Sequence, residues 1–320
     1  MAERLPVVVF TGFLGSGKTT LLSRLLGRHE LGEAAVIVNE LGEVAIDHHL
    51  LRRVDERTVL LGNGCLCCTL RGDLADELRD LLSRRTRGEI PPFRRVLVET
   101  TGLADPTPVL NTILTEPVVR HHFEPGAVIA TVDALNGNGQ LDREEETVKQ
   151  VLVADRIVVT KADVADRGVV DDLEERLRGL NPAADLLEAS FGEADPALLL
   201  APGNLDPRRF RLPAEPLHAD VHPFVLFLDR PVDWTAFGIW LTMLLGSRGA
   251  DVLRVKGLLN VGAPGPVVLN GVQHVVHPPE HLDAWPDDDH RSRIVFIARG
   301  IGRREIEESL AAFDAAARGN

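Results

Sequence analysis

The sequence lacks the features that mark membrane, secreted and repetitive proteins. No apolar run approaches the roughly 18–20 residues that a membrane-spanning helix needs. The first apolar stretch, residues 7–10, is too short for the core of a signal peptide. Internal repeats and low-complexity tracts are absent as well. We therefore expect a globular protein of the cytoplasm that makes no use of a membrane.

Basic residues are in deficit, because the formal net charge is −13 at pH 7. A surface that binds nucleic acid or an anionic membrane in general needs a basic face. The charge therefore argues against both kinds of partner. It is compatible with cations as ligands, although acidity alone is weak evidence for them.

Cysteine is scarce, and all of it lies within four positions. Cys65, Cys67 and Cys68 are the three cysteines of the chain. Residues this close together do not form a disulfide framework. In a reducing compartment we expect them to be thiols.

The length of 320 residues suits one large domain and a smaller one. Apolar strands alternate with helical patterns as far as about residue 200, which predicts an α/β fold with a doubly wound, mostly parallel sheet. Residues 201–216 are rich in proline and glycine and indicate a linker. Strand and helix patterns in residues 217–320 predict a smaller α+β domain. We expect the first domain to span residues 1–200.

A phosphate-binding glycine loop begins the first domain. A β-branched strand runs into Gly12-x-x-x-x-Gly17-Lys18-Thr19, and leucines then recur at helical spacing. Glycines let successive backbone N–H groups point at a phosphate, and the helix dipole favours the same anion. Lys18 would neutralise the β- and γ-phosphates, and the Thr19 hydroxyl would ligate Mg²⁺. The predicted nucleotide-binding residues here are Gly12, Gly15, Ser16, Gly17, Lys18, Thr19 and Thr20.

Two further loops are candidates for sensing the γ-phosphate. A strand ends in Glu99-Thr100-Thr101-Gly102, where Glu99 would reach Mg²⁺ and the Gly102 N–H would meet the γ-phosphate. The carboxyl ends of parallel strands share one edge, so Glu99 should face Lys18. In the polar loop at residues 40–47, Glu40 and Glu43 are candidates for orienting water or holding a metal. A solvated loop carboxylate is the alternative for either one.

The base-reading loop is predicted at Thr160-Lys161-Ala162-Asp163. Asp163 would accept from guanine N1–H and the 2-amino group, and the stem of Lys161 would pack along the base. Thr160 stands where asparagine is expected in such a loop, which shortens one tether to the glycine loop. We expect that to weaken nucleotide binding more than to change the choice of base. Ser190, after a later strand, is a further candidate for the edge of the base.

The cysteine cluster follows a predicted strand and precedes a helix that begins near residue 69. A helix N-terminus lowers the pKa of a thiol, and thiolate is the form that binds metal. Three soft ligands suit Zn²⁺ or a neighbouring transition metal. The fourth ligand would be Glu43, Glu40, water or a client protein, and such an incomplete shell suits a transferable ion. The alternative is a cluster of buried small residues.

A second polar stretch, residues 273–290, mixes histidines with aspartates. Such groups could hold a divalent ion loosely. No fixed ligand spacing matches a known site, so we favour a solvated polar loop.

Five motifs together resemble the CobW-type GTPases, which are metallochaperones related to the nickel-insertion GTPases of hydrogenase and urease maturation. The motifs are the glycine loop, Asn39-Glu40-Leu41-Gly42-Glu43, Gly64-Cys65-Leu66-Cys67-Cys68, Glu99-Thr100-Thr101-Gly102 and Thr160-Lys161-Ala162-Asp163. Segments 254–257, 285–286 and 292–297 resemble the C-terminal domain of the same family.

The resemblance implies that the protein binds GTP or GDP with Mg²⁺, hydrolyses GTP slowly and carries Zn²⁺ or Co²⁺. The recipient would be a client metalloprotein or an enzyme of metal-cofactor biosynthesis. Catalysis would rest on Lys18, Glu40 and Glu99, and the metal would bind Cys65, Cys67, Cys68 and Glu43. Self-association that depends on the nucleotide also stays open.

Two other functions remain as alternatives. One is a P-loop kinase or ATPase that acts on a small molecule, although Asp163 favours guanine over adenine. The other is a non-catalytic metal-binding scaffold with a decayed nucleotide site. The intact Lys18, Thr19 and Glu99 argue against that scaffold.

Overall fold

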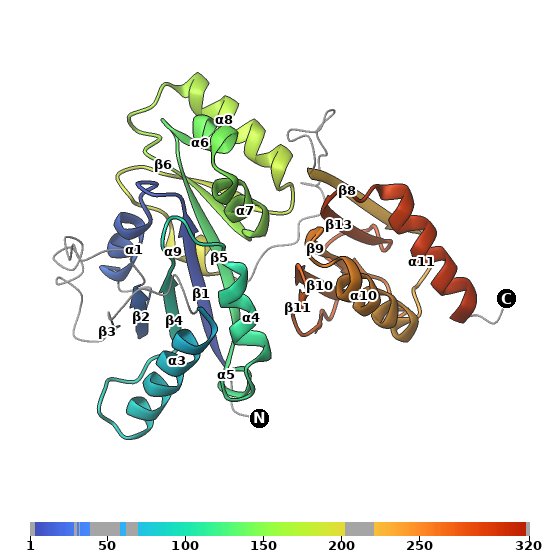
Figure 1. Ribbon diagram of the computed structural model, residues 1–320, viewed down its shortest axis with the longest axis horizontal. Helices are drawn as coiled ribbons and strands as arrows, with labels where there is room; N and C mark the ends of the chain where they lie inside the picture. Colours follow the sequence, from blue (N-terminus) through green and yellow to red (C-terminus); the bar gives the residue numbers. More distant parts are fainter. Residues whose placement is uncertain are drawn as a thin grey trace. The chain divides into compact units, whose positions relative to one another are not determined.

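The computed structural model describes residues 4–28, 31, 33–38, 58–61, 70–201 and 221–317 (Figure 1). Two compact units make up the chain, one built mainly from residues up to 204 and the other mainly from residue 205 onward. Apart from Ala201, the predicted linker at residues 201–216 lies outside the described residues. None of the helices in the described ranges combines the length and the apolar character that crossing a bilayer requires.

The N-terminal unit holds a seven-stranded sheet in the order β3-β2-β4-β1-β5-β6-β7, and every neighbouring pair is parallel. The strands are β1 (Leu5–Gly12), β2 (Ala34–Val38), β3 (Thr58–Leu61), β4 (Arg95–Glu99), β5 (Phe123–Asp133), β6 (Arg156–Thr160) and β7 (Asp185–Ala189). The prediction of a doubly wound parallel sheet is confirmed.

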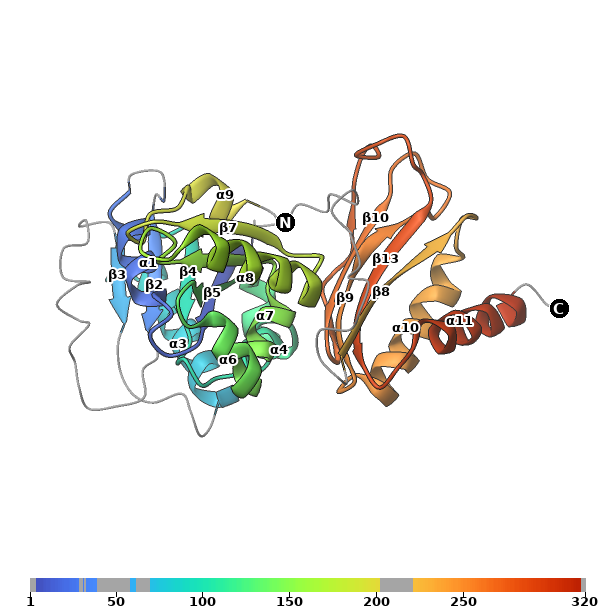
Figure 2. The ribbon, with the colours of Figure 1, turned by 90° about the horizontal axis from the view of Figure 1, so that it is seen from above.

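Helices cover both faces of this sheet (Figure 2). They are α1 (Lys18–Leu26), α3 (Leu70–Thr86), α4 (Thr107–Thr115), α5 (Pro117–His122), α6 (Gly137–Arg143), α7 (Glu145–Val153), α8 (Arg167–Leu180) and α9 (Pro196–Leu200). On one face, Leu21, Leu22 and Leu25 of α1 pack against Val8 and Phe10 of β1. The residues that alternate with these, Val7 and Val9, are also fully buried. Burial on both faces explains why the strand reads as an unbroken apolar run.

The carboxyl ends of the strands meet at one edge, because all seven strands run the same way. At the ends of β4, β1 and β5 the register pairs Phe10 with Glu99 and Gly12 with Thr131. The next pair along the sheet aligns Asp133 with Thr160. The loops that follow β4, β1, β5 and β6 therefore begin side by side at this edge.

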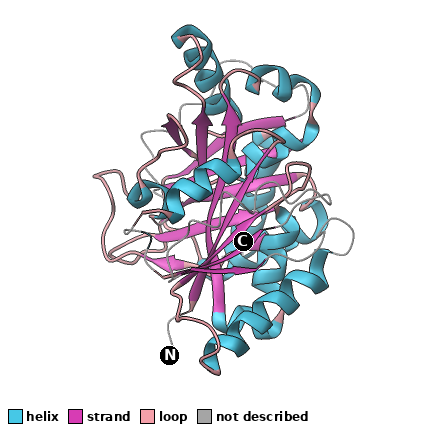
Figure 3. Ribbon diagram, turned by 90° about the vertical axis from the view of Figure 1, so that its left-hand side faces the viewer, coloured by secondary structure: helices cyan, strands magenta, loops and turns pink. Residues whose placement is uncertain are grey.

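The C-terminal unit combines an antiparallel sheet with helices, and Figure 3 distinguishes strands from helices by colour. Its strand order is β11-β10-β9-β13-β8, and β12 pairs with β10. The elements are β8 (Val221–Leu228), α10 (Trp234–Arg248), β9 (Val252–Leu259), β10 (Val267–Val272), β11 (Val275–Val276), β12 (Glu280–His281), β13 (Ser292–Arg299) and α11 (Arg303–Ala317). The prediction of a second, smaller α+β unit is confirmed.

One strand of that unit differs from expectation. The sequence predicts a single strand over residues 267–276, whereas the structure turns at Gln273, whose φ is +50°. Gly271 and Val272 then pair antiparallel with Val276 and Val275. The apolar run conceals the turn, because Gln273 and His274 are not typical turn residues.

Candidate functional site

The glycine loop links β1 to α1 and has the backbone that its sequence predicts. Gly12, Gly15 and Gly17 all have positive φ, at 136°, 73° and 90°. L-residues with a side chain adopt such angles at a cost, whereas glycine does not. At Gly12 a side chain would also collide with Thr131 and with the hydroxyl of Ser16. That hydroxyl lies 2.7 Å from the hydroxyl of Thr131 on β5, which fixes the loop to the sheet.

Lys18 opens α1 and is buried. Its ammonium donates to the carbonyl oxygen of Gly12 at 2.7 Å and to that of Phe13 at 3.1 Å. The cation therefore lies inside the curve of the loop. That is the place from which a P-loop lysine neutralises phosphate charge.

Thr19, in the first turn of α1, meets Glu99 at the end of β4. The Thr19 hydroxyl donates to Glu99 Oε1 at 2.5 Å, and Glu99 is 2% exposed. The Thr100 N–H donates to the carbonyl of Phe10 at 2.9 Å, which holds the end of β4 against β1. A hydroxyl and a carboxylate are hard oxygen ligands, so this pair fits Mg²⁺. Thr20, the next residue, is exposed.

The loop after β4 contacts the glycine loop through backbone atoms. A Cβ added at Gly102 would lie 2.5 Å from the backbone nitrogen of Leu14. From the other side, the Gln150 amide on α7 donates to the carbonyls of Gly102 and Ala104, both at 3.1 Å. Sequence reasoning missed Gln150. A buried amide within the apolar face of α7 is the signal that could have found it.

Thr160 ties the base-reading loop to the glycine loop directly. Its hydroxyl donates to the carbonyl of Ser16 at 2.6 Å, and the Cβ position of Gly17 packs on its methyl group. Lys161 follows with φ at +58°, and its ammonium reaches the carbonyl of Gly15 at 2.9 Å. The shortened tether expected from the sequence is therefore present as a direct hydrogen bond.

Asp133, at the end of β5, is a site residue that sequence reasoning missed. Lys161 donates to its Oδ2 at 2.7 Å, and the carboxylate is 2% exposed. Burial by itself would raise the pKa of Asp133, but hydrogen bonds from Lys161, the Asn136 amide and the Leu135 N–H lower it below its usual value. Asp133 therefore carries the charge that positions Lys161. A carboxylate at the end of a buried strand, as at Glu99, is the signal for it.

Asp163 is exposed and lies in the loop at residues 160–163, after β6. Its Oδ1 accepts from the N–H of Phe191 at 3.1 Å. This contact brings the loop after β6 to the loop after β7, next to the exposed Ser190. The carboxylate thus stands where two loops meet, at the edge that also carries Lys18.

The predicted metal ligands Cys65, Cys67, Cys68 and Glu43 lie outside the described residues, and so does Glu40. The strand before the cysteines is described. β3 pairs parallel to β2, so its end at Leu61 belongs to the same sheet edge as Glu99. Two strand spacings separate β3 from β4, or about 10 Å. β3 therefore ends at the sheet edge that carries the glycine loop.

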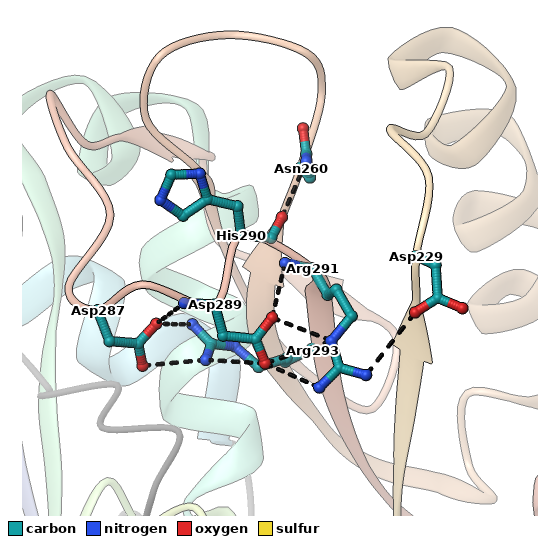
Figure 4. Close-up of polar contacts among 7 residues, drawn as sticks. All are labelled: Asp229, Asn260, Asp287, Asp289, His290, Arg291 and Arg293. Atoms are coloured by element: carbon teal, nitrogen blue, oxygen red, sulfur yellow. Dashed lines mark hydrogen bonds and ion pairs between the residues drawn. The ribbon is translucent and has the colours of Figure 1, made fainter.

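Two aspartates of the histidine and aspartate stretch, Asp287 and Asp289, pair with arginines (Figure 4). Arg293 donates to both oxygens of Asp287 at 3.0 and 3.1 Å, and Arg291 donates to both oxygens of Asp289. The hydrogen bonds from Arg291 lower the pKa of Asp289 to about 2. The His290 ring stacks on Trp285. Within the described ranges, no group of three or more histidine, cysteine, aspartate or glutamate side chains forms that could hold a metal ion.

Comparison with known proteins extends over both units. Residues 6–188 match the family "CobW/HypB/UreG, nucleotide-binding domain", and residues 221–314 match the "Cobalamin synthesis protein cobW C-terminal domain". The zinc chaperone YjiA of Escherichia coli is 34% identical over 95% of this chain and 97% of its own length. The zinc chaperone CobW of Pseudomonas aeruginosa is 31% identical over 96% and 91%.

Solved structures agree. The Zn(II)-bound YjiA GTPase from E. coli superposes with a TM-score of 0.71 at 30% identity, covering 97% of this chain and 99% of that one. A Zn(II)-bound variant of YjiA, in which one glutamate and two cysteines are replaced by alanine, gives the same TM-score. With a glycine loop, a Thr19–Glu99 pair and the loop at residues 160–163 on one sheet edge, this chain belongs to the CobW/HypB/UreG family of P-loop GTPases.

Proposed function

We propose that this protein is a GTP-dependent zinc metallochaperone. It binds GTP with Mg²⁺, hydrolyses GTP slowly to GDP and phosphate, and couples that cycle to capture and release of Zn²⁺. The observation that carries the proposal is the joining of the phosphate, magnesium and base loops by three contacts: Thr19 to Glu99, Thr160 to Ser16, and Lys161 to Gly15.

The phosphate end of the nucleotide would lie in the glycine loop. Lys18, already turned into the loop, exchanges its carbonyl contacts for the β- and γ-phosphate oxygens. Thr19 and Glu99 would hold Mg²⁺, which neutralises charge that develops on the phosphates. The Gly102 N–H would meet the γ-phosphate, since Gly102 packs closely on Leu14 of the glycine loop.

The base end would lie over residues 160–163. The Asp163 carboxylate accepts two N–H groups from guanine, a pairing that adenine cannot make. Ser190, on the adjoining loop, would contact the edge of the base. This donor and acceptor pattern favours a GTPase over the alternative of a small-molecule kinase or ATPase.

Glu99 and Glu40 are the two candidates for the residue that activates the attacking water. Because the Thr19 hydroxyl already engages Glu99, a magnesium role fits Glu99 better than a role as general base. Glu40 is therefore the proposed residue that orients the attacking water. Lys18 contributes to catalysis by stabilising charge on the phosphates.

Cys65, Cys67, Cys68 and Glu43 would bind the cargo metal, with zinc favoured by the names of the relatives and cobalt by the family resemblance alone. The shared edge of β3 and β4 supports coupling between the metal and the nucleotide. The YjiA variant without two of its cysteines still carries Zn(II) in its crystal. Zinc bound to a purified chain is therefore not sufficient evidence for the cysteine site.

The recipient would be a client metalloprotein or an enzyme of metal-cofactor biosynthesis in the cytoplasm. The net charge of −13 argues against nucleic acid as a partner. Self-association controlled by the nucleotide is a further part of the proposal that sedimentation with GDP and with a GTP analogue would test.

Phosphate release from GTP is the primary test, with Lys18→Ala as the matched inactive variant. We expect release by the unmodified chain to need Mg²⁺ and to fall to background in the variant. Equal release by both chains would favour the non-catalytic scaffold. Displacement of GTP by ATP at equal concentration would favour the kinase or ATPase.

A further inference from the structure

The turn at residues 190–193, between β7 and α9, has an unusual residue at its centre. The Glu193 N–H donates to the Ser190 carbonyl at 2.9 Å, and the two central residues both have positive φ, at 54° for Phe191 and 74° for Gly192. Turns with two such residues favour Asn-Gly, Asp-Gly or Gly-Gly. An aromatic residue in the left-handed region costs conformational energy. The turn therefore holds Phe191 in a backbone conformation that aromatic residues disfavour.

Three contacts fix this turn in place. Asp163 accepts the N–H of Phe191 at 3.1 Å. Arg28, just beyond α1, forms an ion pair with Glu193 at 3.3 Å. A Cβ at Gly192 would lie 2.8 Å from the methyl group of Thr20. The turn is thus held beside both the glycine loop helix and the carboxylate proposed to read guanine.

The phenyl ring gains little from the fold in return for this strain. Phe191 is 72% exposed, so its ring leaves most of its apolar surface in water. Within the described residues, three non-glycine residues have positive φ: Lys161, Phe191 and Gln273. Two of the three lie next to Asp163, one in its own loop and one as its hydrogen-bond donor. The positive φ of Lys161 is explained by its contacts, because its ammonium donates hydrogen bonds to Asp133 and to the carbonyl of Gly15.

We propose that the Phe191 ring stacks on the guanine ring whose edge Asp163 reads. The inference rests on the proposed function, because it needs a guanine nucleotide in this site. Aromatic stacking raises affinity for any base with a π-face, whereas selection among bases comes from the hydrogen bonds of Asp163. Phe191 therefore contributes affinity for the base, and Asp163 contributes the choice of base.

The test compares Phe191→Asn with Phe191→Trp and with Leu198→Ala, which alters another exposed apolar residue of the same unit. Asparagine suits the turn, so the fold is kept and the melting temperature should stay equal or rise. We expect GDP to bind Phe191→Asn about 5- to 100-fold more weakly, with parental affinity in Phe191→Trp and Leu198→Ala. Inorganic tripolyphosphate, which has no base, should bind all four chains equally.

A nuclear magnetic resonance signature adds an independent readout. The ring current of Phe191 should move the guanine H8 resonance of bound GDP upfield, and Phe191→Asn should abolish that shift. GDP affinity in Phe191→Asn within twofold of the parent would overturn the inference. An equal loss of GDP and tripolyphosphate would overturn it too, because the effect would then be structural.

Failure of the proposed function gives a different pattern. In that case GDP would bind the parent chain no better than it binds Lys18→Ala, and both proposals would fall together. Parental binding of GDP that is lost in Lys18→Ala, with no effect at Phe191, would leave the GTPase proposal standing and reject the stacking role alone.

Discussion

The hydroxyl of Thr160 lies 2.6 Å from the backbone carbonyl oxygen of Ser16 and donates a hydrogen bond to it. A second carbonyl, that of Val132, lies 3.3 Å away. This contact connects the end of β6 to the glycine loop without the longer amide of an asparagine. In the proposed function, the base and phosphate ends of the site would therefore share one support.

Removing this hydroxyl should damage nucleotide binding. Thr160→Val keeps the shape but leaves the Ser16 carbonyl without its donor, which costs about 1–3 kcal/mol. We expect a similar loss in unfolding free energy and GDP binding about 5- to 100-fold weaker, by urea denaturation and calorimetry. Thr86→Val, which removes an exposed helical hydroxyl contact, is the control. Parental affinity in Thr160→Val would contradict the support described here. Tighter binding in Thr160→Asn would confirm the weakening expected from the sequence.

Neutralising Glu99 should slow GTP hydrolysis and weaken the binding of Mg²⁺. Glu99→Gln keeps an acceptor for the Thr19 hydroxyl but removes the charge. We expect hydrolysis to fall on the order of 100-fold and the magnesium concentration needed for half-maximal rate to rise. Rates measured across a magnesium titration check this. An unchanged magnesium dependence would assign Glu99 another role.

The amide of Gln150 should control the loop after β4. Gln150→Leu leaves the carbonyls of Gly102 and Ala104 without its N–H groups, which should lower the unfolding free energy by about 1–3 kcal/mol. Because Gly102 faces the γ-phosphate in the proposal, affinity for a GTP analogue should fall more than affinity for GDP. Calorimetry with both nucleotides measures the difference. Equal losses for the two would indicate a general effect on folding.

Zinc and GTP should bind with reciprocal coupling. Replacing Cys65, Cys67 and Cys68 by serine is expected to remove the zinc site whose affinity responds to a non-hydrolysable GTP analogue. Competition with a chromogenic chelator, with and without the analogue, measures that response in both chains. If the analogue changes zinc affinity equally in the parent and the serine variant, the responsive site lies elsewhere. Identical zinc affinities with and without the analogue would reject the coupling.

The Asp289 carboxyl should titrate at about pH 2 in the folded protein, because Arg291 hydrogen-bonds to it. Its pKa is lowered by folding, so its contribution to stability is complete above the unfolded value near 3.9 and is lost as the pH falls from there towards 2. Carboxyl resonances across an acid titration measure it. In Arg291→Gln the midpoint should rise towards 3.9, whereas Arg304→Gln, remote on α11, should leave it unchanged.

Local sequence patterns predicted the parts of the site that depend on backbone geometry. The glycine loop and Glu99 follow from strand, loop and helix spacing, and parallel pairing of β1 with β4 then brings Glu99 to Thr19. Asp133 and Gln150 were missed because their partners, Lys161 and Gly102, are distant in sequence. Periodicity describes burial along one element and says little about which buried polar group meets which.

Thr160 and Phe191 illustrate a different limit. Threonine in place of the expected asparagine at residue 160 predicted a shortened tether. Only the structure shows that the Thr160 hydroxyl is long enough to reach the Ser16 carbonyl of the glycine loop. Phe191 carries no motif, and its interest comes from a positive φ that sequence does not display. The strand predicted over residues 267–276 failed for a related reason, because Gln273 turns without glycine or proline.

The contact of Gly102 with Leu14 has a consequence for how nucleotide preference can change. The two loops approach through peptide groups, and any side chain larger than hydrogen at residue 102 would collide with the neighbouring main chain. Peptide N–H groups are the same whatever the residue type, so point mutation has little means of altering recognition of the terminal phosphate. Side chains, in contrast, would make up the proposed opposite end of the site, at Thr160, Lys161, Asp163 and Phe191. A variant that accepts a different base is therefore accessible by substitution, whereas one that accepts a different terminal group requires rebuilding the loops themselves.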